Sequence, residues 1–288
     1  MDSTPEFLTN KLPIGKWVQF FVEYLTDNFD DQFRLFSSGL EWIILETIDI
    51  ISMIPPLLLI AAIGLLGYWL HRSGKIFFGI VAALVLILNL GYWEQTIETV
   101  ALVLFATTVS VMFGVPMGIL AAHYRWVYTV MRPVLDLMQT IPTFVYLIPT
   151  LMLFGLGMVP GLISTVIFAI PAPIRLTYLG ITGVPEQLTD AGKAFGASRM
   201  QLLRKVELPH ALPTIMAGLT QCIMLSLSMV VIAALVGADG LGKPVIRALN
   251  SVNIAQGFEA GLAIVVVAIV LDRLLKEPEF TKAGAKQG

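Results

Sequence analysis

The stretch VGADGLGKPVI, residues 236–246, comes close to a nucleotide-binding P-loop. A P-loop reads G-x-x-x-x-G-K-[ST]: its backbone N–H groups cradle phosphates, its lysine contacts them, and its Ser or Thr hydroxyl binds Mg²⁺. Gly237, Gly242 and Lys243 fit this spacing, but Pro244 stands where the Mg²⁺ ligand belongs. The apolar run before it is typical of a membrane helix rather than of a sheet strand. We therefore predict neither a nucleotide site nor a catalytic residue in this stretch.

The composition indicates a membrane protein. Of the 288 residues, 57% are hydrophobic and 13% are charged, whereas a soluble domain carries about 25% charged residues. The net charge of −2 offers no basic surface for nucleic acid. Cys222 is the single cysteine, which excludes a disulfide within the chain, and the three histidines lack metal-ligand spacing. We expect no metal site.

Charge-free apolar runs predict an all-α integral membrane protein with about seven transmembrane helices. A span needs about 20 mostly apolar residues. The run 137–174 is too long for one span, so we divide it at the turn GLGMVPG. The remaining predicted spans are 50–70, 76–93, 99–122, a span after Pro213 within 208–238, and 254–271.

Lysine and arginine accumulate on one side of these spans. Thirteen of the 18 fall in alternate connections and in the C-terminal tail. Cytoplasmic loops carry the excess of such residues. We therefore expect the N-terminus outside and the C-terminus in the cytoplasm.

An N-terminal segment, residues 1–49, precedes the first predicted span. Its apolar residues recur at helical spacing in two stretches, Trp17, Phe20, Phe21, Tyr24 and Leu25, then Leu40, Ile44, Ile48 and Ile51. Acidic residues take much of the remaining face, which predicts one or two amphipathic helices at the outer surface. Two interpretations stay open, in which the apolar face packs against the protein itself or contacts lipid.

A polar connection, residues 184–213, lies between the fifth and sixth predicted spans. Pro185 and Glu186 suit a helix start, Gly196 suits its end, and Ser198 begins a capping box for a second helix. Few basic residues and the membrane tether at both ends argue against a DNA-binding unit. The apolar stripes of the two helices favour either a loop packed on its own bundle or a docking element for a cytoplasmic partner.

The spacing in this connection resembles the EAA motif of binding-protein-dependent ABC transporter permeases. That motif reads E-A-A, three residues, G, nine residues, I-x-L-P. This sequence has Asp190-Ala191-Gly192, then Gly196, then VELP at 206–209. Aspartate replaces the first glutamate and valine the isoleucine. Glycine replaces the second alanine, which weakens the first helix by about 1 kcal/mol.

Further stretches are similar to the glycine betaine, proline betaine and choline subgroup of these permeases. They are 135–149, 160–171, 224–245 and 263–274. The resemblance extends over about residues 12–275. It implies a type I ABC importer permease core of five helices at 94–275, with coupling helices at 184–209, two accessory transmembrane helices at 50–93 and a cytoplasmic tail at 276–288.

The resemblance also implies partners. Such permeases are homodimers in the prokaryotic plasma (inner) membrane and contact its lipid. They receive substrate from an external binding protein. Cytoplasmic ATP-binding subunits hold ATP and Mg²⁺, so no cofactor is expected in this chain. The residues implied at the contact with the ATPase are Asp190, Ala191, Gly196, Ala197, Ser198, Leu203, Leu208 and Pro209.

Polar residues inside the predicted spans, and aromatic residues beside them, mark a candidate substrate path. The candidates are Thr143, Phe144, Tyr146, Gln221 and Ser226. A quaternary ammonium cannot donate hydrogen bonds, but it binds aromatic faces. Phe144 and Tyr146 thus either form a weak cation–π path or serve as ordinary aromatics of a membrane helix.

The glycine-rich stretch at the opposite end has three interpretations. Gly240, Gly242 and Lys243 could contact the binding protein, form part of an external gate, or simply turn the chain back into the membrane. For the whole chain, the alternative to an importer permease is a stand-alone secondary transporter or channel for a small osmolyte. The EAA spacing and the lack of intramembrane ionisable residues argue against that alternative.

Overall fold

Long apolar segments form the helices from which the chain is built. The computed structural model describes residues 13–275, and no strand occurs within that range. The helices are α2 (Ile14–Ser52), α3 (Pro56–His71), α4 (Gly74–Asn89), α5 (Trp93–His123), α6 (Arg125–Thr140), α7 (Thr143–Phe154), α8 (Met158–Ala169), α9 (Pro171–Thr182), α10 (Glu186–Ala194), α11 (Arg199–Leu202), the π-helix η1 (Leu203–Glu207), α12 (Leu208–Ala233), the 3₁₀ turn η2 (Ala234–Val236), α13 (Gly242–Asn250) and α14 (Ile254–Leu275).

The all-α membrane fold is confirmed, and the structure refines the number of spans. Four stretches are long and apolar enough to cross a membrane: Trp93–His123, Met158–Thr182, Arg199–Val236 and Ile254–Leu275. The number rises to six if each of two bent helix pairs, α2 with α3 and α6 with α7, counts as one span. The remaining predicted span corresponds to α4, an apolar helix of 16 residues that is shorter than a full crossing.

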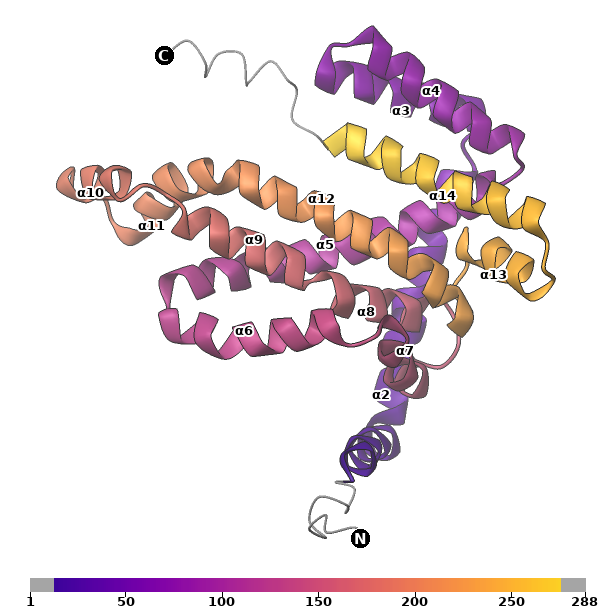
Figure 1. Cartoon of the computed structure of the whole chain (residues 1–288), viewed down its shortest axis with the longest axis horizontal. Coiled ribbons are helices and arrows are strands. Elements are labelled where there is room, and N and C mark those ends of the chain that lie inside the picture. Colours follow the sequence, from indigo (N-terminus) through magenta and orange to yellow (C-terminus); the bar gives the residue numbers. More distant parts are fainter. Residues whose placement is uncertain (1–12, 276–288) are drawn as a thin grey trace, which may run out of the picture.

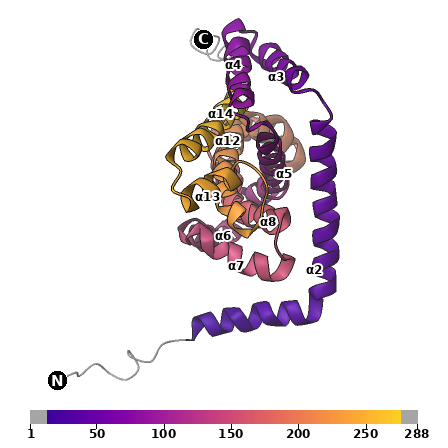
Figure 2. The ribbon, with the colours of Figure 1, turned by 90° about the vertical axis from the view of Figure 1, so that its right-hand side faces the viewer.

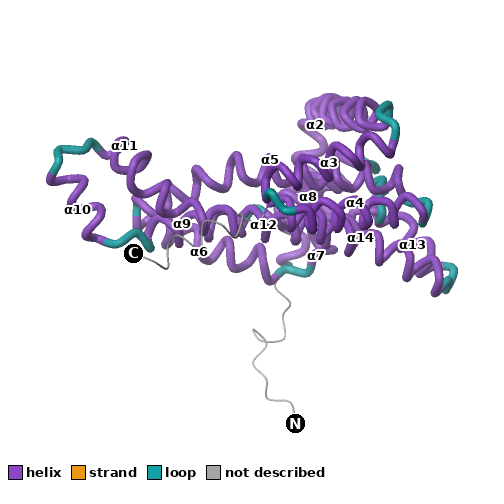
Figure 3. The backbone as a smooth tube through the Cα atoms, turned by 90° about the horizontal axis from the view of Figure 1, so that it is seen from above, coloured by secondary structure: helices purple, strands orange, loops and turns teal. Residues whose placement is uncertain are grey.

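Helices α5, α9 and α12 lie side by side along the length of the molecule (Figure 1). Helices α10 and α11 sit at one end of this bundle and α13 sits at the other, as the view from above also shows (Figure 3). We call these the α10 end and the α13 end. Helix α14 packs against α12, α5 and the α3–α4 pair.

The N-terminal helix α2 is bent into two arms (Figure 2). Phe29 interrupts it with non-helical backbone angles. The second arm buries Ile44 and Ile48 in the main core, while the first arm leaves Trp17 and Phe20 exposed. The predicted one or two amphipathic helices correspond to one kinked helix. Its second arm packs its predicted apolar face against the bundle, whereas the predicted face of the first arm stays uncovered.

The bend between α6 and α7 corrects the predicted fourth span. The two helices meet at 97° across Ile141 and Pro142, and Pro142 has no N–H to donate to a continuing helix. Pro149 lies inside α7 without ending it. The predicted connection around Arg132 is also helical, since it lies within α6. The GLGMVPG turn forms where expected, with positive φ at Gly155 and Gly157, although its last residues belong to α8.

Close packing of α5 on α9 depends on two glycines. A Cβ at Gly118 would lie 2.6 Å from the backbone oxygen of Ile174, and one at Gly114 would lie 2.9 Å from Pro173 Cγ. The GxxxG spacing of Gly114 and Gly118 therefore serves helix packing, as small residues do in membrane bundles. This contact braces α5 on both sides of Pro116, and α5 runs through that proline as one helix.

Candidate functional site

The segment 184–209 projects at the α10 end, away from the centre of the bundle (Figures 1 and 3). Phe195 has 93% of its surface exposed, and Leu188 and Met200 are also exposed. A loop folded back on its own bundle would bury such side chains, because burial of apolar area is favourable. The exposed ridge therefore favours the docking interpretation over a self-packed loop.

Gly196 ends α10 by a left-handed backbone turn. Its φ is +75°, a region that glycine enters without steric cost. The N–H of Gly196 donates to the Lys193 oxygen at 2.9 Å, and the N–H of Ala197 donates to the Gly192 oxygen at 3.1 Å. These bonds satisfy carbonyls that the end of a helix leaves free. The predicted helix end at Gly196 is confirmed.

Ser198 starts the second helix with the capping box that its sequence predicted. The N–H of Gln201 donates to Ser198 Oγ at 3.4 Å, and the N–H of Ser198 donates to Gln201 Oε1 at 2.8 Å. Each side chain thus satisfies one backbone donor at the start of α11. The cap thus defines the start of α11 at Arg199.

We expect Ser198→Ala to loosen the start of α11. Loss of an N-cap costs about 1 kcal/mol. Amide protons of residues 199–203 should therefore exchange about fivefold faster, which hydrogen exchange measured by mass spectrometry can follow. Ser198→Asp keeps a side-chain acceptor and serves as the control. Equal exchange in the wild type and Ser198→Ala would show that the cap does not hold this turn.

Gly192 explains one departure from the EAA pattern. A Cβ at this position would lie 2.7 Å from Leu202 Cδ1 and 3.7 Å from Val206 Cγ2. The glycine therefore lets α10 approach α11 and η1 closely. Gly192 lowers the helix propensity of α10, and in return α10 packs more closely against α11 and η1.

The residues implied at an ATPase contact divide into two groups. Exposed residues are Asp190, Ala191, Gly196, Ser198 and Pro209, and half-buried residues are Ala197, Leu203 and Leu208. Asp190 also pairs with Lys193 at 3.0 Å on the surface of α10. The exposed group is free to meet another protein, whereas the half-buried group holds the two helices and η1 together.

The five candidates for a substrate path do not share one environment. Phe144 and Gln221 are exposed, Thr143 is half-buried, and Ser226 is fully buried with its hydroxyl donating to the Cys222 oxygen at 2.9 Å. Tyr146 donates from its hydroxyl to the Met138 oxygen at 2.5 Å. That bond bridges the bend between α6 and α7, so Tyr146 has a structural role in addition to any contact with substrate.

Other polar residues gather inside the bundle. Cys222 and Ser226 on α12 are buried near Thr107 and Ser110 on α5. The hydroxyls of Thr107 and Ser110 have no hydrogen-bond partner among the described residues. Among residues 13–275, no group of three or more His, Cys, Asp or Glu side chains is placed to hold a metal ion.

The glycine turn, residues 237–242, packs tightly at the α13 end. Helix α12 and the 3₁₀ turn η2 precede it, where a P-loop requires a strand. A Cβ at Gly240 would lie 2.6 Å from Thr99 Oγ1, and a Cβ at Gly242 would lie 2.6 Å from the Val230 oxygen. Lys243 forms an ion pair with Asp239. The glycines thus allow the turn to lie against both α5 and α12.

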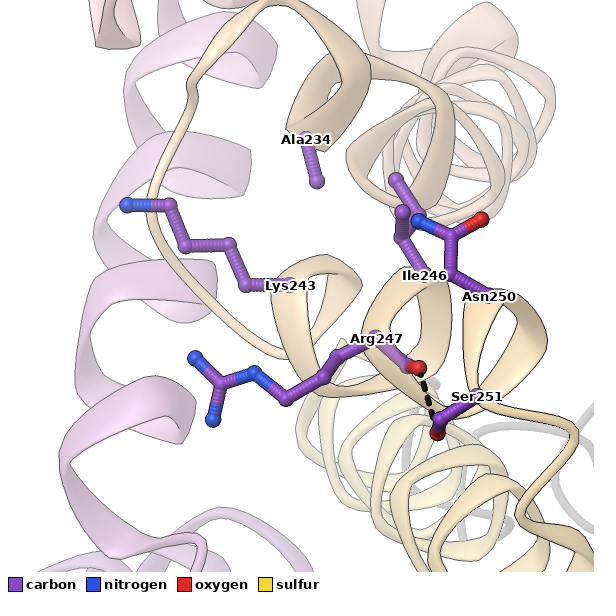
Figure 4. Close-up of a pocket in the computed structure, with 6 residues that line it drawn as sticks. All are labelled: Ala234, Lys243, Ile246, Arg247, Asn250 and Ser251. Carbon is purple, nitrogen blue, oxygen red and sulfur yellow. Dashed lines mark hydrogen bonds between the residues drawn. The ribbon is translucent and has the colours of Figure 1, made fainter.

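A cavity of about 430 Å³ adjoins this turn (Figure 4). Its lining residues are Ala234, Lys243, Ile246, Arg247, Asn250 and Ser251. The side chains of Lys243 and Arg247 extend to the same side in this view, and Ser251 Oγ donates to the Arg247 oxygen at 2.8 Å. Arg247 and Asn250 contribute polar groups to this lining, whereas the charge of Lys243 is already paired with Asp239.

His123 and Glu207 form a pair that the sequence did not predict. His123 at the end of α5 lies 3.1 Å from the carboxylate of Glu207 in η1. A charged residue just before the final Leu-Pro of the motif was visible in the sequence, but nothing there indicated its partner 84 positions earlier. The sequence likewise contained no indication that Thr99 contacts the glycine turn.

Comparison with known proteins adds a consistent set of similarities. Residues 114–276 match the family described as binding-protein-dependent transport system inner membrane component. The chain is 43% identical over 272 residues to the glycine betaine transport system permease protein OpuAB of Bacillus subtilis strain 168, covering 94% of this chain and 96% of that one. It is 40% identical over 265 residues to the glycine betaine/proline betaine transport system permease protein ProW of Escherichia coli K12, covering 91% and 74%.

A solved structure is also similar. A chain in the inward-facing structure of the MetNI methionine ABC transporter aligns with a TM-score of 0.53 and 25% identity. The alignment covers 62% of this chain and 91% of the other. The matching part is thus nearly all of the smaller protein, and the remainder of this chain is additional to it.

Proposed function

The chain belongs to the family of binding-protein-dependent transport system inner membrane components, and from that premise we propose that it is the permease subunit of an ATP-driven importer for a quaternary ammonium osmolyte. The observation that carries the proposal is the 184–209 segment: two short helices, closed by Gly196 and Ser198, present an apolar ridge at one end of a membrane bundle. Such a ridge suits a groove on a partner protein.

The proposed partner at this ridge is a cytoplasmic ATP-binding subunit. ATP and Mg²⁺ would be bound there and not in this chain. Closure of the ATPase pair would push on α10 and α11, and the membrane helices would change their tilt in response. This assignment places the α10 end in the cytoplasm and the C-terminus on the same side, in agreement with the excess of Lys and Arg there.

The proposed substrate is glycine betaine or a close analogue such as proline betaine or choline. The two relatives described above, which align with more than 90% of this chain, carry glycine betaine in their names. We propose that a second copy of the chain completes the path, because Phe144 and Gln221 are exposed in a single copy. A quaternary ammonium would meet aromatic faces there. An external binding protein would deliver it near the α13 end.

Reconstitution tests this function directly. The chain and its cognate ATP-binding subunit are reconstituted in liposomes together with its binding protein. Uptake of radiolabelled glycine betaine is then measured once with ATP and once with ADP as the supplied nucleotide. We expect uptake only with ATP and with all three components. Unlabelled proline betaine, choline, carnitine and proline then compete in turn, which identifies the preferred substrate.

The stand-alone transporter is the alternative that this experiment separates. Uptake by the chain alone, driven by an imposed ion gradient and unaffected by ATP, would contradict the importer proposal. The exposed Phe195 ridge would then require a different partner.

A further inference from the structure

Helix α5 is tied at both of its ends to the segments that flank α12. We infer that His123 and Glu207 are positioning residues which make α5 and α12 move as one bar, so that displacement of the 184–209 segment reaches the glycine turn at the α13 end. The inference rests on the proposed importer function and names a route by which its two ends communicate.

The first tie lies at the α10 end. Nε2 of His123 is 3.1 Å from Oε2 of Glu207, and Nδ1 of the same ring is 2.9 Å from the backbone oxygen of Ile119. The contact between the ring and the carboxylate lies within ion-pair distance, although Glu207 Oε2 accepts no aligned hydrogen bond from any described residue. The Glu207 side chain is only 10% exposed. A buried carboxylate that loses its partner is strongly unfavourable, which makes this contact hard to break.

Glu207 lies at the junction through which a displacement of α10 and α11 would reach α12. It is the last residue of the π-helix η1, which joins α11 directly to α12. Single π-turns inside α-helices are uncommon and recur at functional sites. A push on α10 and α11 therefore passes through η1 before it reaches α12, and Glu207 diverts part of that push to the end of α5.

The second tie lies at the α13 end. The N–H of Leu241 donates to Thr99 Oγ1 at 2.8 Å, and both residues are fully buried. Gly240, with φ of +121°, brings the backbone of the glycine turn against Thr99. The turn that follows α12 is thereby fixed to the start of α5.

The two ties act on one antiparallel pair. Thr99 and His123 are 24 residues apart on α5, about 36 Å at 1.5 Å per residue. Between them α5 packs against α12, and α9 braces α5 beside Pro116 through Gly114 and Gly118. A helix fixed at both ends and supported at its proline transmits displacement along its axis. Sliding of α5 past α12 would require both ties to break.

The test measures coupling rather than activity alone. In proteoliposomes containing the permease, ATPase and binding protein, we count glycine betaine imported per ATP hydrolysed. Glu207→Gln and His123→Gln should each lower that ratio about tenfold while the complex still assembles and hydrolyses ATP. The double variant should be no worse than either single one, because the two residues act as one unit. His123→Glu with Glu207→Lys should restore at least half of the ratio.

The other end supplies a second, independent variant. Thr99→Val removes the acceptor for Leu241 and should also lower the ratio, whereas Thr99→Ser keeps the hydroxyl and should not. Arg34→Gln breaks the exposed ion pair with Asp30 on α2 and serves as the control for loss of an ion pair. If Glu207→Gln does not yield a folded protein, the Thr99 pair still decides the question.

The outcomes distinguish this inference from the function on which it rests. If the wild-type complex fails to import with ATP, the importer proposal itself is wrong. If the wild type imports and the His123, Glu207 and Thr99 variants keep the wild-type ratio of import to ATP hydrolysis, only the inferred joint movement of α5 and α12 is wrong. Loss of ATPase assembly in Glu207→Gln would also overturn the inference, because Glu207 would then act in docking.

Discussion

Replacement of Gly196 by valine is expected to reduce uptake by about 5- to 30-fold while the membrane bundle stays folded. Gly196 has φ of +75°, and a Cβ there would meet no atom within 4 Å. The penalty therefore comes from the backbone alone. An L-residue in the left-handed region costs roughly 1–2 kcal/mol, and more for a β-branched one. That energy corresponds to a 5- to 30-fold fall in the population of the native turn.

The measurement pairs uptake with protein quality. Proteoliposome uptake is compared with the detergent melting temperature of Gly196→Val, which should stay within a few degrees of the wild type because the site lies outside the core. Gly196→Asn is the matched control, since asparagine tolerates this backbone region better than other residues. Equal loss in the asparagine and valine variants would show that the glycine is needed for partner contact rather than for the turn.

The second large effect concerns stability. Gly118→Ala should destabilise the bundle by about 1–3 kcal/mol, the usual cost of forcing extra atoms into a packed interior. The new Cβ would lie 2.6 Å from the Ile174 backbone oxygen and 2.6 Å from Thr177 Cβ. Backbone cannot rotate away as a side chain can, so α5 must separate from α9. The melting temperature should fall by several degrees, on the order of 2–4 °C for each kcal/mol.

Gly261→Ala is the matched control for that experiment. Gly261 lies in α14, and its added Cβ would meet nothing within 4 Å. Alanine in place of glycine inside a helix gains about 0.5–1 kcal/mol. The melting temperature should therefore stay the same or rise slightly. A Gly118→Ala variant as stable as Gly261→Ala would contradict the close contact of α5 with α9.

Local chemistry in the 184–209 segment could be predicted because it depends on neighbours in sequence. The helix end at Gly196 and the capping box at Ser198 involve partners within a few residues. The split at Gly155 likewise follows from a backbone conformation that glycine favours.

The shape of the bent elements could not be predicted in the same way. The stretch beginning at 137 has the composition of a continuous span, yet α6 and α7 meet at 97°. Pro142 and Pro149 have the same intrinsic effect on a helix, and only Pro142 ends one. Surrounding packing decides which proline breaks the chain, as it does for Pro116 within α5.

The sequence by itself determined an apolar all-α membrane chain, the order of its spans and the position of its polar two-helix segment, since these follow from composition, periodicity and local turn chemistry. Only the tertiary structure decided that Glu207 meets His123 and that Leu241 meets Thr99, across 84 and 142 positions. Such pairs arise when helices pack, because packing sets which distant side chains face each other and no local pattern encodes that choice.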